Sequence, residues 1–499
     1  MQFTRRGILA GLLATGAAAP LWAEAPGNAP GIAPARSPLP RRRGDSGATR
    51  SEPVTPDSLI AAAKLGAASV GFVLADAVTG QVIESRDATT AQPPASVMKS
   101  VTAAYALDRL GPDHRFATRL LATGPLQGGT LQGDLILAGG GDPVLDTDML
   151  GDLAARLAAT GIRRITGAFL LYDAALPRME RIDTEQPEFV GYNPAISGLN
   201  LNFNRVHFEW RRAGGDWALT MDARAERFVP PVKLARVTVA RRETPLFTYQ
   251  GSAAREDWTV ASAALGKGGA RWLPVRHPAL YVGEVFATLM GAHGLNLPAP
   301  AIIDTLPEAR ELARHDSDRL AEILRDMLKH STNLTAEVAG MAASHAASHR
   351  ASAIATREWA KARHRIAPVI ADHSGLGAAS RISAADMVKL LVDVQAGALP
   401  GLLKNHGMFD ARGKRLDAHP VEVRAKTGTL NFVSTLAGYI TPPGGRRMAF
   451  AIFAADPERR AALSLAERED PPGGGGWNKR AKTLQGQLIH RWATLHGTA

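Results

Sequence analysis

The chain has 499 residues, of which 45% are hydrophobic and 21% charged, with a formal net charge of +11 and no cysteine. A chain of this length holds more than one hydrophobic core, and the lack of cysteine excludes a disulfide framework, a thiol nucleophile and a cysteine-based zinc site. Seven arginines against three acids give residues 1–56 a net charge of +4 and leave +7 for the rest. Because no nucleic-acid motif accompanies this mild excess, nucleic acid is not expected as a partner.

Residues 1–25 have the pattern of a secretory signal peptide. Arg5 and Arg6 precede an apolar run over residues 8–19, and small residues follow at Ala23 and Ala25. A short basic region, a short apolar run and small residues at a cleavage site define such a signal, and the run is too short to span a membrane. The paired arginines also fit a twin-arginine signal, with an ordinary secretory signal as the alternative. We expect export to the periplasm.

Residues 26–56 are predicted to form a disordered basic linker. The segment is rich in Pro, Gly, Ala and Ser, and it contains three consecutive arginines at 41–43. Little in it can bury apolar surface, so no packed core is expected. Its basic residues could make weak contact with an anionic envelope surface; a merely solvated linker is the alternative.

The first part of a discontinuous domain is expected over residues 57–117. A helix-like segment at 59–65 leads to an apolar strand at 69–74, and a glycine-containing turn connects this to a second strand around Val82. Ser96 then opens a helix that stops at Gly111-Pro112. Since Ser96 and Lys99 are three residues apart, their side chains are neighbours on one face of this helix.

Residues 118–312 are predicted to be inserted subdomains. More than 230 residues separate Lys99 from Ser331, which begins the short motif Ser331-Thr332-Asn333. The insertion reads as mostly β structure, with a helix near its end over residues 279–293. Its strand-like segments are residues 135–137, 169–172, 237–239 and 258–260.

The second part of this discontinuous domain is expected over residues 313–499. A helix at 317–327 precedes a second helix that begins within Ser331-Thr332-Asn333, and a hairpin follows Lys426-Thr427-Gly428. The closing helix, at about 478–493, is expected to pack on the sheet through Trp477 and Trp492. Strands flanked by terminal helices predict an α+β fold in which an antiparallel sheet is sandwiched by helices.

Three short motifs stand in order along the chain: Ser96-Val97-Met98-Lys99, Ser331-Thr332-Asn333 and Lys426-Thr427-Gly428. Each alone is common, and helix capping or a strand end would explain it. Together and in this order they are the signature of serine enzymes that react with β-lactams and D-alanyl-D-alanine amides.

With these motifs the chain resembles the D-alanyl-D-alanine carboxypeptidase/endopeptidases of the low-molecular-mass class C penicillin-binding proteins. The resemblance runs from about residue 57 to the C-terminus. It implies a transpeptidase-like catalytic domain whose first part is residues 57–117 and whose second part is residues 313–499. In one familiar segment, Asp372-His373-Ser374-Gly375-Leu376, His373 stands where the family commonly has glycine. Further similar segments are residues 94–99, 110–116, 133–143 and 200–204.

The resemblance implies a role for each motif residue. Ser96 would attack the penultimate D-alanine carbonyl and form an acyl-enzyme, and Lys99 would accept its proton. Ser331, with Lys426, would relay a proton to the departing amine, and Asn333 would hold the substrate amide.

The resemblance also implies a binding site for the end of the substrate. Thr427, Gly428 and Thr429 would bind the terminal carboxylate, and the backbone N–H groups of Ser96 and Thr429 would form the oxyanion hole. Asp173 would meet the amino group of the third stem-peptide residue, with a solvated strand-end carboxylate as the alternative.

The implied partners are peptidoglycan stem peptides as substrates and β-lactams as covalent inhibitors, and no cofactor or metal is expected. His345 and His349 are four residues apart on a predicted helix, but the glutamate of a zinc protease helix is missing between them. The alternative functions are a serine β-lactamase and a non-catalytic wall-binding protein.

Overall fold

The computed structural model describes residues 54–465 and 467–496. The predicted signal peptide and all but the last three residues of the predicted linker lie outside the described residues. None of the helices in the described range combines the length and apolar character that a bilayer crossing requires.

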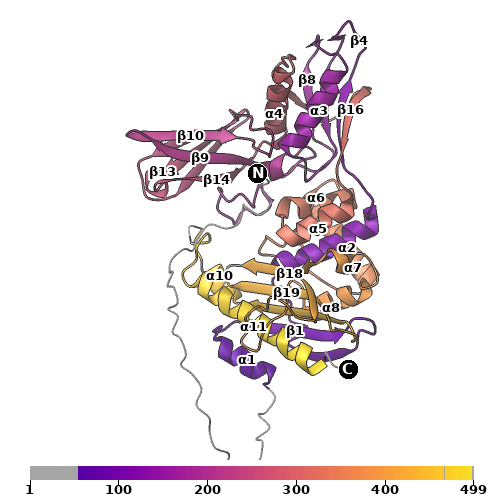
Figure 1. Cartoon of the computed structure of the whole chain (residues 1–499), viewed down its shortest axis with the longest axis vertical. Helices are drawn as coiled ribbons and strands as arrows, with labels where there is room; N and C mark the ends of the chain where they lie inside the picture. The colour runs from indigo at the N-terminus through magenta and orange to yellow at the C-terminus, as the bar shows by residue number, and fades with distance from the viewer. Residues whose placement is uncertain (1–53, 466, 497–499) are drawn as a thin grey trace, which may run out of the picture. The chain divides into compact units, whose positions relative to one another are not determined.

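A six-stranded sheet in the order β17-β18-β19-β20-β1-β2 is the central layer of the part that carries the three motifs (Figure 1). All of its neighbouring strands are antiparallel. β1 pairs with β20 along eight residues, so the N-terminal hairpin completes a sheet built mainly from the C-terminal part of the chain. The strands are β1 (Ser69–Asp76), β2 (Val82–Arg86), β17 (Lys404–Asn405), β18 (Glu422–Leu430), β19 (Val433–Thr441) and β20 (Met448–Ala455).

Helices cover both faces of this sheet, as the sequence predicts. β19 and β20 are buried along nearly their whole length. On one face, α11 (Gly474–His496) and α1 (Pro56–Ala63) pack through a core that includes Trp477 and Trp492. The Trp492 ring lies 5.6 Å from that of Phe72 on β1. The predicted packing of the closing helix through its tryptophans is therefore confirmed.

The opposite face carries the helices that hold the first two motifs. Ser96 lies in the 3-10 turn η1, which leads directly into α2, and the loop of Ser331 connects α5 to α6. α6 packs against both α2 and α7, and α8 packs against β20. These elements are η1 (Ala95–Val97), α2 (Met98–Leu110), α5 (Leu320–His330), α6 (Asn333–Ser344), α7 (His349–His364), α8 (Ala384–Asp393) and α9 (Leu399–Leu402). The short helix α10 (Pro457–Ala461) follows β20, and its Arg459 lies over the Phe432 ring.

The segment between the first two motifs builds its own hydrophobic core. Its largest sheet has five strands in the order β15-β8-β6-β3-β16. β3 and β16 pair with each other, so the chain leaves and re-enters the rest of the structure on adjacent strands. The strands are β3 (Ala117–Ala122), β6 (Leu135–Gly139), β8 (Phe169–Tyr172), β15 (Ala301–Ile303) and β16 (Arg310–Asp316). Because β3 and β16 frame the segment, we keep residues 118–312 as the proposed insertion.

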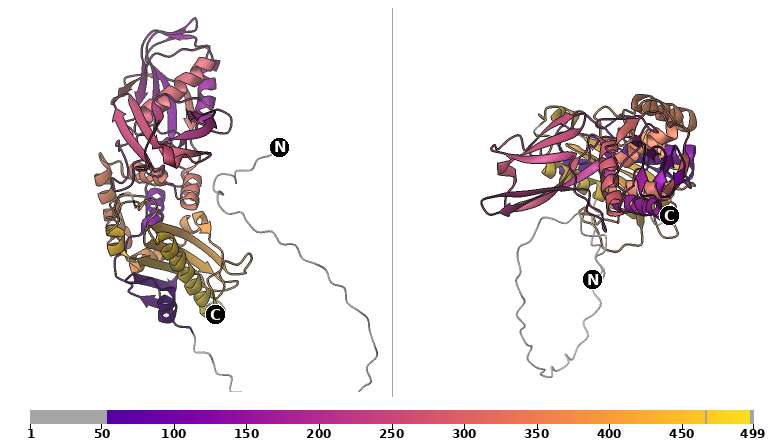
Figure 2. Two further views of the ribbon diagram at one scale, coloured as in Figure 1. Left: turned by 90° about the vertical axis from the view of Figure 1, so that its left-hand side faces the viewer. Right: turned by 90° about the horizontal axis from the view of Figure 1, so that it is seen from above.

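Two helices, α3 (Thr147–Ala159) and α4 (Pro278–Ala292), pack on this core. The sequence predicts α4 but misses α3, whose N-cap Asp146 accepts a hydrogen bond from Met149 N at 2.8 Å. Three three-stranded sheets complete the segment (Figure 2). Their strands are β4 (Leu126–Gln127), β5 (Thr130–Leu131), β7 (Arg164–Ile165), β9 (Arg205–Ala213), β10 (Asp216–Asp222), β11 (Ala235–Ala240), β12 (Phe247–Ser252), β13 (Arg255–Ala261) and β14 (Gly268–Pro274).

Candidate active site

Ser96 is half-buried in the tight turn that begins α2. The preceding residue, Ala95, has a left-handed backbone conformation with φ of 47°. Thr435 on β19 donates a hydrogen bond from Oγ1 to Pro94 O at 2.7 Å and so ties this turn to the sheet. The serine is thus fixed at the junction of helix and sheet, which agrees with the predicted helix start.

Lys99 lies one turn further along α2 and is fully buried. Its Nζ is 3.0 Å from Ser96 Oγ, and it donates hydrogen bonds to Asn333 Oδ1 at 2.7 Å and to Ser374 O at 2.8 Å. Burial lowers the pKa of Lys99 to about 8, although the negative charges of Asp372 and Glu337 act in the opposite direction. An amine with this pKa can exist in the neutral form near physiological pH, as a proton acceptor requires.

Ser331 and Lys426 form a second pair in the site. Ser331 ends α5 in the left-handed conformation, with φ of 61°, and this turn directs its hydroxyl to Lys426 Nζ at 3.0 Å. Lys426 is buried on β18, and burial lowers its pKa well below the ordinary value. The positive charges of Lys99 and Lys404 lower this pKa further.

Gly428 allows β18 to approach the turn that carries Ser96. A Cβ atom at this position would lie 2.1 Å from Thr435 Oγ1 and 2.8 Å from Pro94 O, so a side chain would force the strand away. Thr427 and Thr429, on either side of Gly428, are exposed. They project from the same face of the strand, since successive side chains alternate.

A cleft of about 260 Å³ lies beside these residues, and its lining includes Ser96, Ser331, Asn333 and Thr429. The two buried lysines lie behind the serines that line it, and Thr427 is not among the lining residues. The insertion supplies another part of the wall, because Tyr192 lines the cleft and its carbonyl oxygen accepts a hydrogen bond from Asn333 Nδ2 at 2.9 Å. The three motifs therefore converge on one cleft.

The segment after β20 closes the cleft with charged side chains that the sequence reasoning did not single out. Arg460, Arg468 and Glu469 line it. Arg468 donates to the backbone oxygen of Glu185 at 2.6 Å, and Glu469 pairs with Arg271 at 2.7 Å. No motif marks these residues, because their place in the cleft depends on contacts with residues of the insertion that are distant in the sequence.

Asp173 is not among the residues that line this cleft. It follows β8, is 2% exposed, and accepts a hydrogen bond from Arg178 Nε at 2.8 Å. Arg178 also pairs with Asp304 and lines a separate hollow of about 570 Å³. The structure does not bring Asp173 together with the other predicted site residues, and its contact with substrate stays a prediction.

The prediction that His345 and His349 share a helix is wrong. His345 ends α6 in the left-handed conformation, and His349 is the first residue of α7. Ser348 caps α7 by accepting a hydrogen bond from Ala351 N at 3.2 Å, which starts a new helix between the two histidines.

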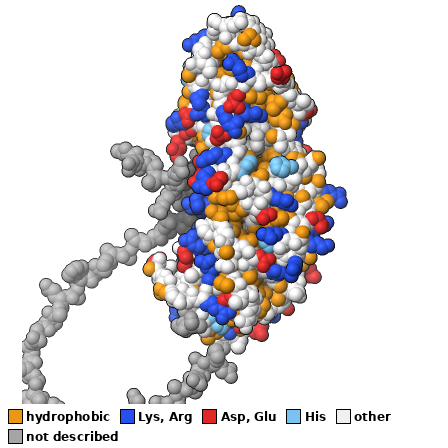
Figure 3. All heavy atoms as spheres, turned by 90° about the vertical axis from the view of Figure 1, so that its right-hand side faces the viewer, with side chains coloured by type: hydrophobic (Ala, Val, Ile, Leu, Met, Phe, Trp, Pro, Cys, Tyr) orange, Lys and Arg blue, Asp and Glu red, His pale blue; other side chains and the backbone are white. Residues whose placement is uncertain are grey.

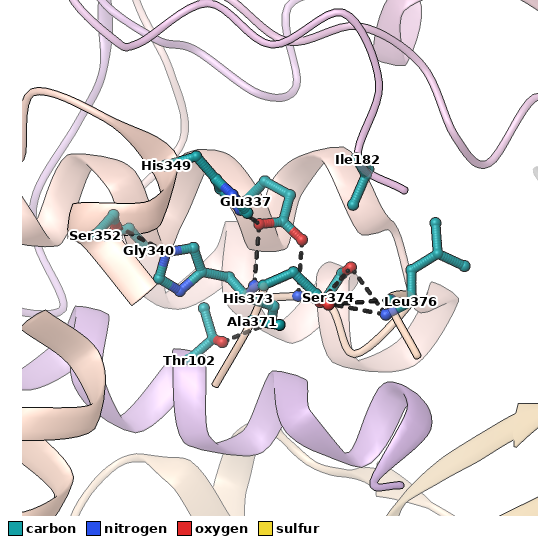
Figure 4. Close-up of polar contacts among 12 residues, drawn as sticks. Thr102, Ile182, Glu337, Gly340, His349, Ser352, Ala371, His373, Ser374 and Leu376 are labelled. Carbon is teal, nitrogen blue, oxygen red and sulfur yellow. Dashed lines mark hydrogen bonds and ion pairs between the residues drawn. The ribbon is translucent and has the colours of Figure 1, made fainter. Parts of the chain in front are cut away.

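Another group of side chains has the composition of a metal site. Ligand atoms of Glu337, His349 and His373 lie within 4.8 Å of one another. Both carboxylate oxygens of Glu337, however, already accept backbone hydrogen bonds, from His373 N at 3.0 Å and from Ser374 N at 2.9 Å (Figure 4). Because both Glu337 oxygens are engaged in this way, and His373 Nε2 lies 2.8 Å from Ser352 Oγ, we interpret the group as a hydrogen-bond network.

The sequence profile of the D-Ala-D-Ala carboxypeptidase 3 (S13) family matches residues 55–469. The chain belongs to this family. The S13 protein is 30% identical to a D-alanyl-D-alanine carboxypeptidase of Actinomadura over 451 residues, which cover 79% of each chain. It is 24% identical to the D-alanyl-D-alanine carboxypeptidase DacB of Haemophilus influenzae over 415 residues, which cover 77% of this chain and 85% of DacB. The membership inferred from the three motifs is thereby confirmed.

Solved structures confirm the fold of the S13 protein. The crystal structure of penicillin binding protein 4 from Haemophilus influenzae superposes with a TM-score of 0.71 at 21% identity, covering 87% of this chain and 99% of that one. The same protein in complex with a β-lactam gives a TM-score of 0.68. The predicted combination of an α+β penicillin-binding domain with an additional, mostly β part is therefore correct.

Proposed function

We propose that Ser96 is the nucleophile with which this S13 protein cleaves D-alanyl-D-alanine bonds in peptidoglycan stem peptides. The family makes the protein a serine D-alanyl-D-alanine carboxypeptidase. The assignment to particular residues rests on one observation. Ser96 with Lys99, and Ser331 with Lys426, form two hydroxyl–amine pairs, each at 3.0 Å, and the two serines line the same cleft.

Acylation begins when Ser96 Oγ attacks the carbonyl carbon of the penultimate D-alanine. The hydroxyl proton passes to the neutral Nζ of Lys99, which is within hydrogen-bond reach. The oxyanion that forms is stabilised by the backbone N–H groups of Ser96 and Thr429, and one such donor is typically worth about 3 kcal/mol.

Departure of the amine requires a proton on its nitrogen. The Ser331 hydroxyl, 3.0 Å from Lys426 Nζ, is suited to deliver that proton while the lysine replenishes it. Collapse of the tetrahedral intermediate then breaks the peptide bond and leaves Ser96 esterified. Water hydrolyses the ester, which releases the shortened stem peptide and restores the serine hydroxyl. The proton that Lys99 took up is returned to Lys426, so both lysines end the cycle in their starting protonation states.

Substrate orientation comes from the remaining motif residues. Asn333 holds the substrate amide, and Thr427 and Thr429 bind the terminal carboxylate beside the Lys426 charge. Gly428 allows the close approach of this strand. The charged wall of Arg460 and its neighbours suits a peptide that carries ionised groups.

Carboxypeptidase and endopeptidase reactions share the same acyl-enzyme and differ in the amine that leaves. In the first the amine is a free terminal D-alanine, and in the second it belongs to a neighbouring stem peptide in a cross-link. We propose that the cleft serves both reactions, and both products should be assayed.

The sequence of residues 1–56, together with this cell-wall activity, supports export by a signal peptide to the periplasm. We propose only weak contact between the basic linker and anionic envelope polymers. On the face of the protein drawn in Figure 3, basic and acidic side chains are interspersed.

The test is the intact mass of the mature protein after brief exposure to benzylpenicillin, with Ser96→Ala and the exposed-serine control Ser262→Ala. We expect a stable adduct on the parent and on the control, and none on Ser96→Ala. Rapid penicillin turnover without a lasting adduct would favour a β-lactamase. No reaction at all would favour a wall-binding protein. Release of D-alanine from a pentapeptide and cleavage of cross-linked dimers, measured in parallel, separate the two peptidase activities.

A further inference from the structure

A buried carboxylate lies directly behind the predicted proton acceptor. Glu337, on α6, is completely buried, and its two oxygens accept backbone hydrogen bonds from His373 and Ser374. The next atoms along this loop are part of the site, because Ser374 O accepts a hydrogen bond from Lys99 Nζ at 2.8 Å. Glu337 therefore holds a segment that in turn holds the lysine.

His349 is the charged partner of this carboxylate. Its Nε2 lies 2.8 Å from Glu337 Oε2, and it comes from the first turn of α7, where its side chain is 18% exposed (Figure 4). Burial tends to lower the pKa of His349, but the hydrogen bond and charge of Glu337 outweigh it and raise that pKa. Burial alone would raise the pKa of Glu337, whereas His349 and the loop N–H groups lower it. The two groups thus stabilise each other in their charged forms.

The loop is fixed at further points that carry no charge. A ring nitrogen of His373 lies 2.8 Å from Ser352 Oγ, and Thr102 Oγ1 donates to His373 O at 2.6 Å. Burial lowers the pKa of His373 to about 4, so this histidine is neutral at working pH. Its ring fits because position 340 is glycine: a Cβ there would lie 2.2 Å from the ring.

We propose that Glu337 and His349 are positioning residues for Lys99. They form an ion pair that fixes the Ser374 loop, and the net charge of this pair influences whether the lysine amine is protonated. The proposal rests on the assignment of Lys99 as the proton acceptor. Neither residue touches substrate. Through this pair, His349 in the partly exposed first turn of α7 influences the protonation of the buried Lys99.

The sign of the effect follows from the charges that face Lys99. Asp372 and Glu337 are the nearby anions that favour its charged form. Lys426 is the neighbouring amine, and the charge of Lys99 helps to lower the pKa of Lys426. His349 faces Glu337, Asp372 and the neutral His373. Loss of the Glu337 charge should therefore favour the neutral amine. Loss of the His349 charge leaves Glu337 uncompensated and should favour the protonated amine.

The experiment measures the acylation rate with a chromogenic β-lactam between about pH 6 and pH 10 for the parent, Glu337→Gln and His349→Gln. The glutamine at 349 can still donate a hydrogen bond to Glu337 but carries no charge. His345→Gln is the matched control, because His345 ends α6 and its side chain makes no hydrogen bond to Glu337.

The quantity compared is the ratio of the acylation rate at about pH 6.5 to the rate on the alkaline plateau. We expect this ratio to fall roughly two- to tenfold in His349→Gln and to rise in Glu337→Gln, which corresponds to a shift of up to about one unit in the pKa of Lys99. The control should match the parent. A purely structural role would change both variants in the same direction or only lower the plateau, and either result would overturn the proposal, as would an unchanged ratio in His349→Gln.

If Glu337→Gln fails to fold, the pH profile of His349→Gln alone tests the proposal. This variant should fold, because α7 does not need a charged side chain at its first residue. Failure of this proposal is distinguishable from failure of the proposed function. If the parent forms no adduct on Ser96, the function is wrong. If the parent forms the adduct and the charge variants do not move the pH profile, only the inference is wrong.

Discussion

Acylation of Ser96 should depend on pH through the buried amine of Lys99. Burial moves the pKa of this lysine from 10.5 to about 8. A shift of this size corresponds to about 3 kcal/mol between the two protonation states. At pH 7 it raises the neutral fraction from about one in 3,000 for an ordinary lysine to about one in ten.

The sign is fixed by the chemistry, because only the neutral amine can accept the serine proton. The second-order rate constant for acylation should rise about tenfold per pH unit well below pH 8 and stop rising above it. Stopped-flow measurement with a chromogenic β-lactam gives this constant, and uncatalysed hydrolysis of the same β-lactam is the blank. Lys99→Arg, which stays protonated, should remove the pH-dependent reaction. A parent rate constant that is flat between pH 6 and pH 8 would refute the assignment of Lys99 as base.

Three further variants test the rest of the site. Ser331→Ala removes the hydroxyl beside Lys426, and it should lower kcat for D-alanine release about 100-fold or more without changing the far-UV circular dichroism; an unchanged kcat would contradict the proton relay. Gly428→Ala places a methyl group 2.1 Å from the nearest side-chain oxygen and should strongly reduce penicillin labelling, whereas Gly475→Ala, which has open space around it, should label normally. Asp173→Asn should lower the melting temperature and leave KM unchanged if its arginine pair is structural, whereas a raised KM in the folded variant would support the predicted substrate contact.

Much of the fold could be predicted because local signals and burial agree. The helix after Ser96 stops at Gly111, whose φ of 79° is unfavourable for other residues. Helix α4 begins with Pro278 at its first position. The apolar run 448–455 is a central strand that is buried throughout. In each case the residues that specify the element are contiguous in the sequence.

The rest could not be predicted, because it depends on contacts between distant segments. Tyr192 and Arg460 reach the cleft from the insertion and from the segment after β20, and no spacing in the sequence relates either of them to Ser96. Asp173 shows the converse, since a carboxylate after a strand suggests exposure and only the fold reveals its partner, Arg178. The break between His345 and His349 did have a local signal, the capping residue Ser348, which the four-residue spacing obscured.

The pairing of Gly340 with His373 shows how an unusual residue is accommodated. In the sequence, His373 is a departure from a pattern that commonly has glycine, with no visible compensation. In the structure, its buried ring lies against Gly340, and a Cβ on that glycine would approach ring atoms to 2.2 Å. Gly340→Ala should therefore destabilise the protein by about 1–3 kcal/mol, the usual cost of overpacking a tight interior. If the ring moves away from the new methyl group, the hydrogen bond between His373 and Ser352 is also lost.

The same geometry predicts that His373→Gly rescues Gly340→Ala. Removal of the ring has its own cost, because it leaves a cavity and breaks the hydrogen bond to Ser352. In that background, however, the alanine methyl group occupies vacated space. A double-mutant cycle on urea unfolding should give a coupling of at least about 1 kcal/mol, with the alanine nearly neutral in the His373→Gly protein. Additive costs would mean that the chain relaxes around the methyl group without moving the ring, and that Gly340 is not what makes room for His373.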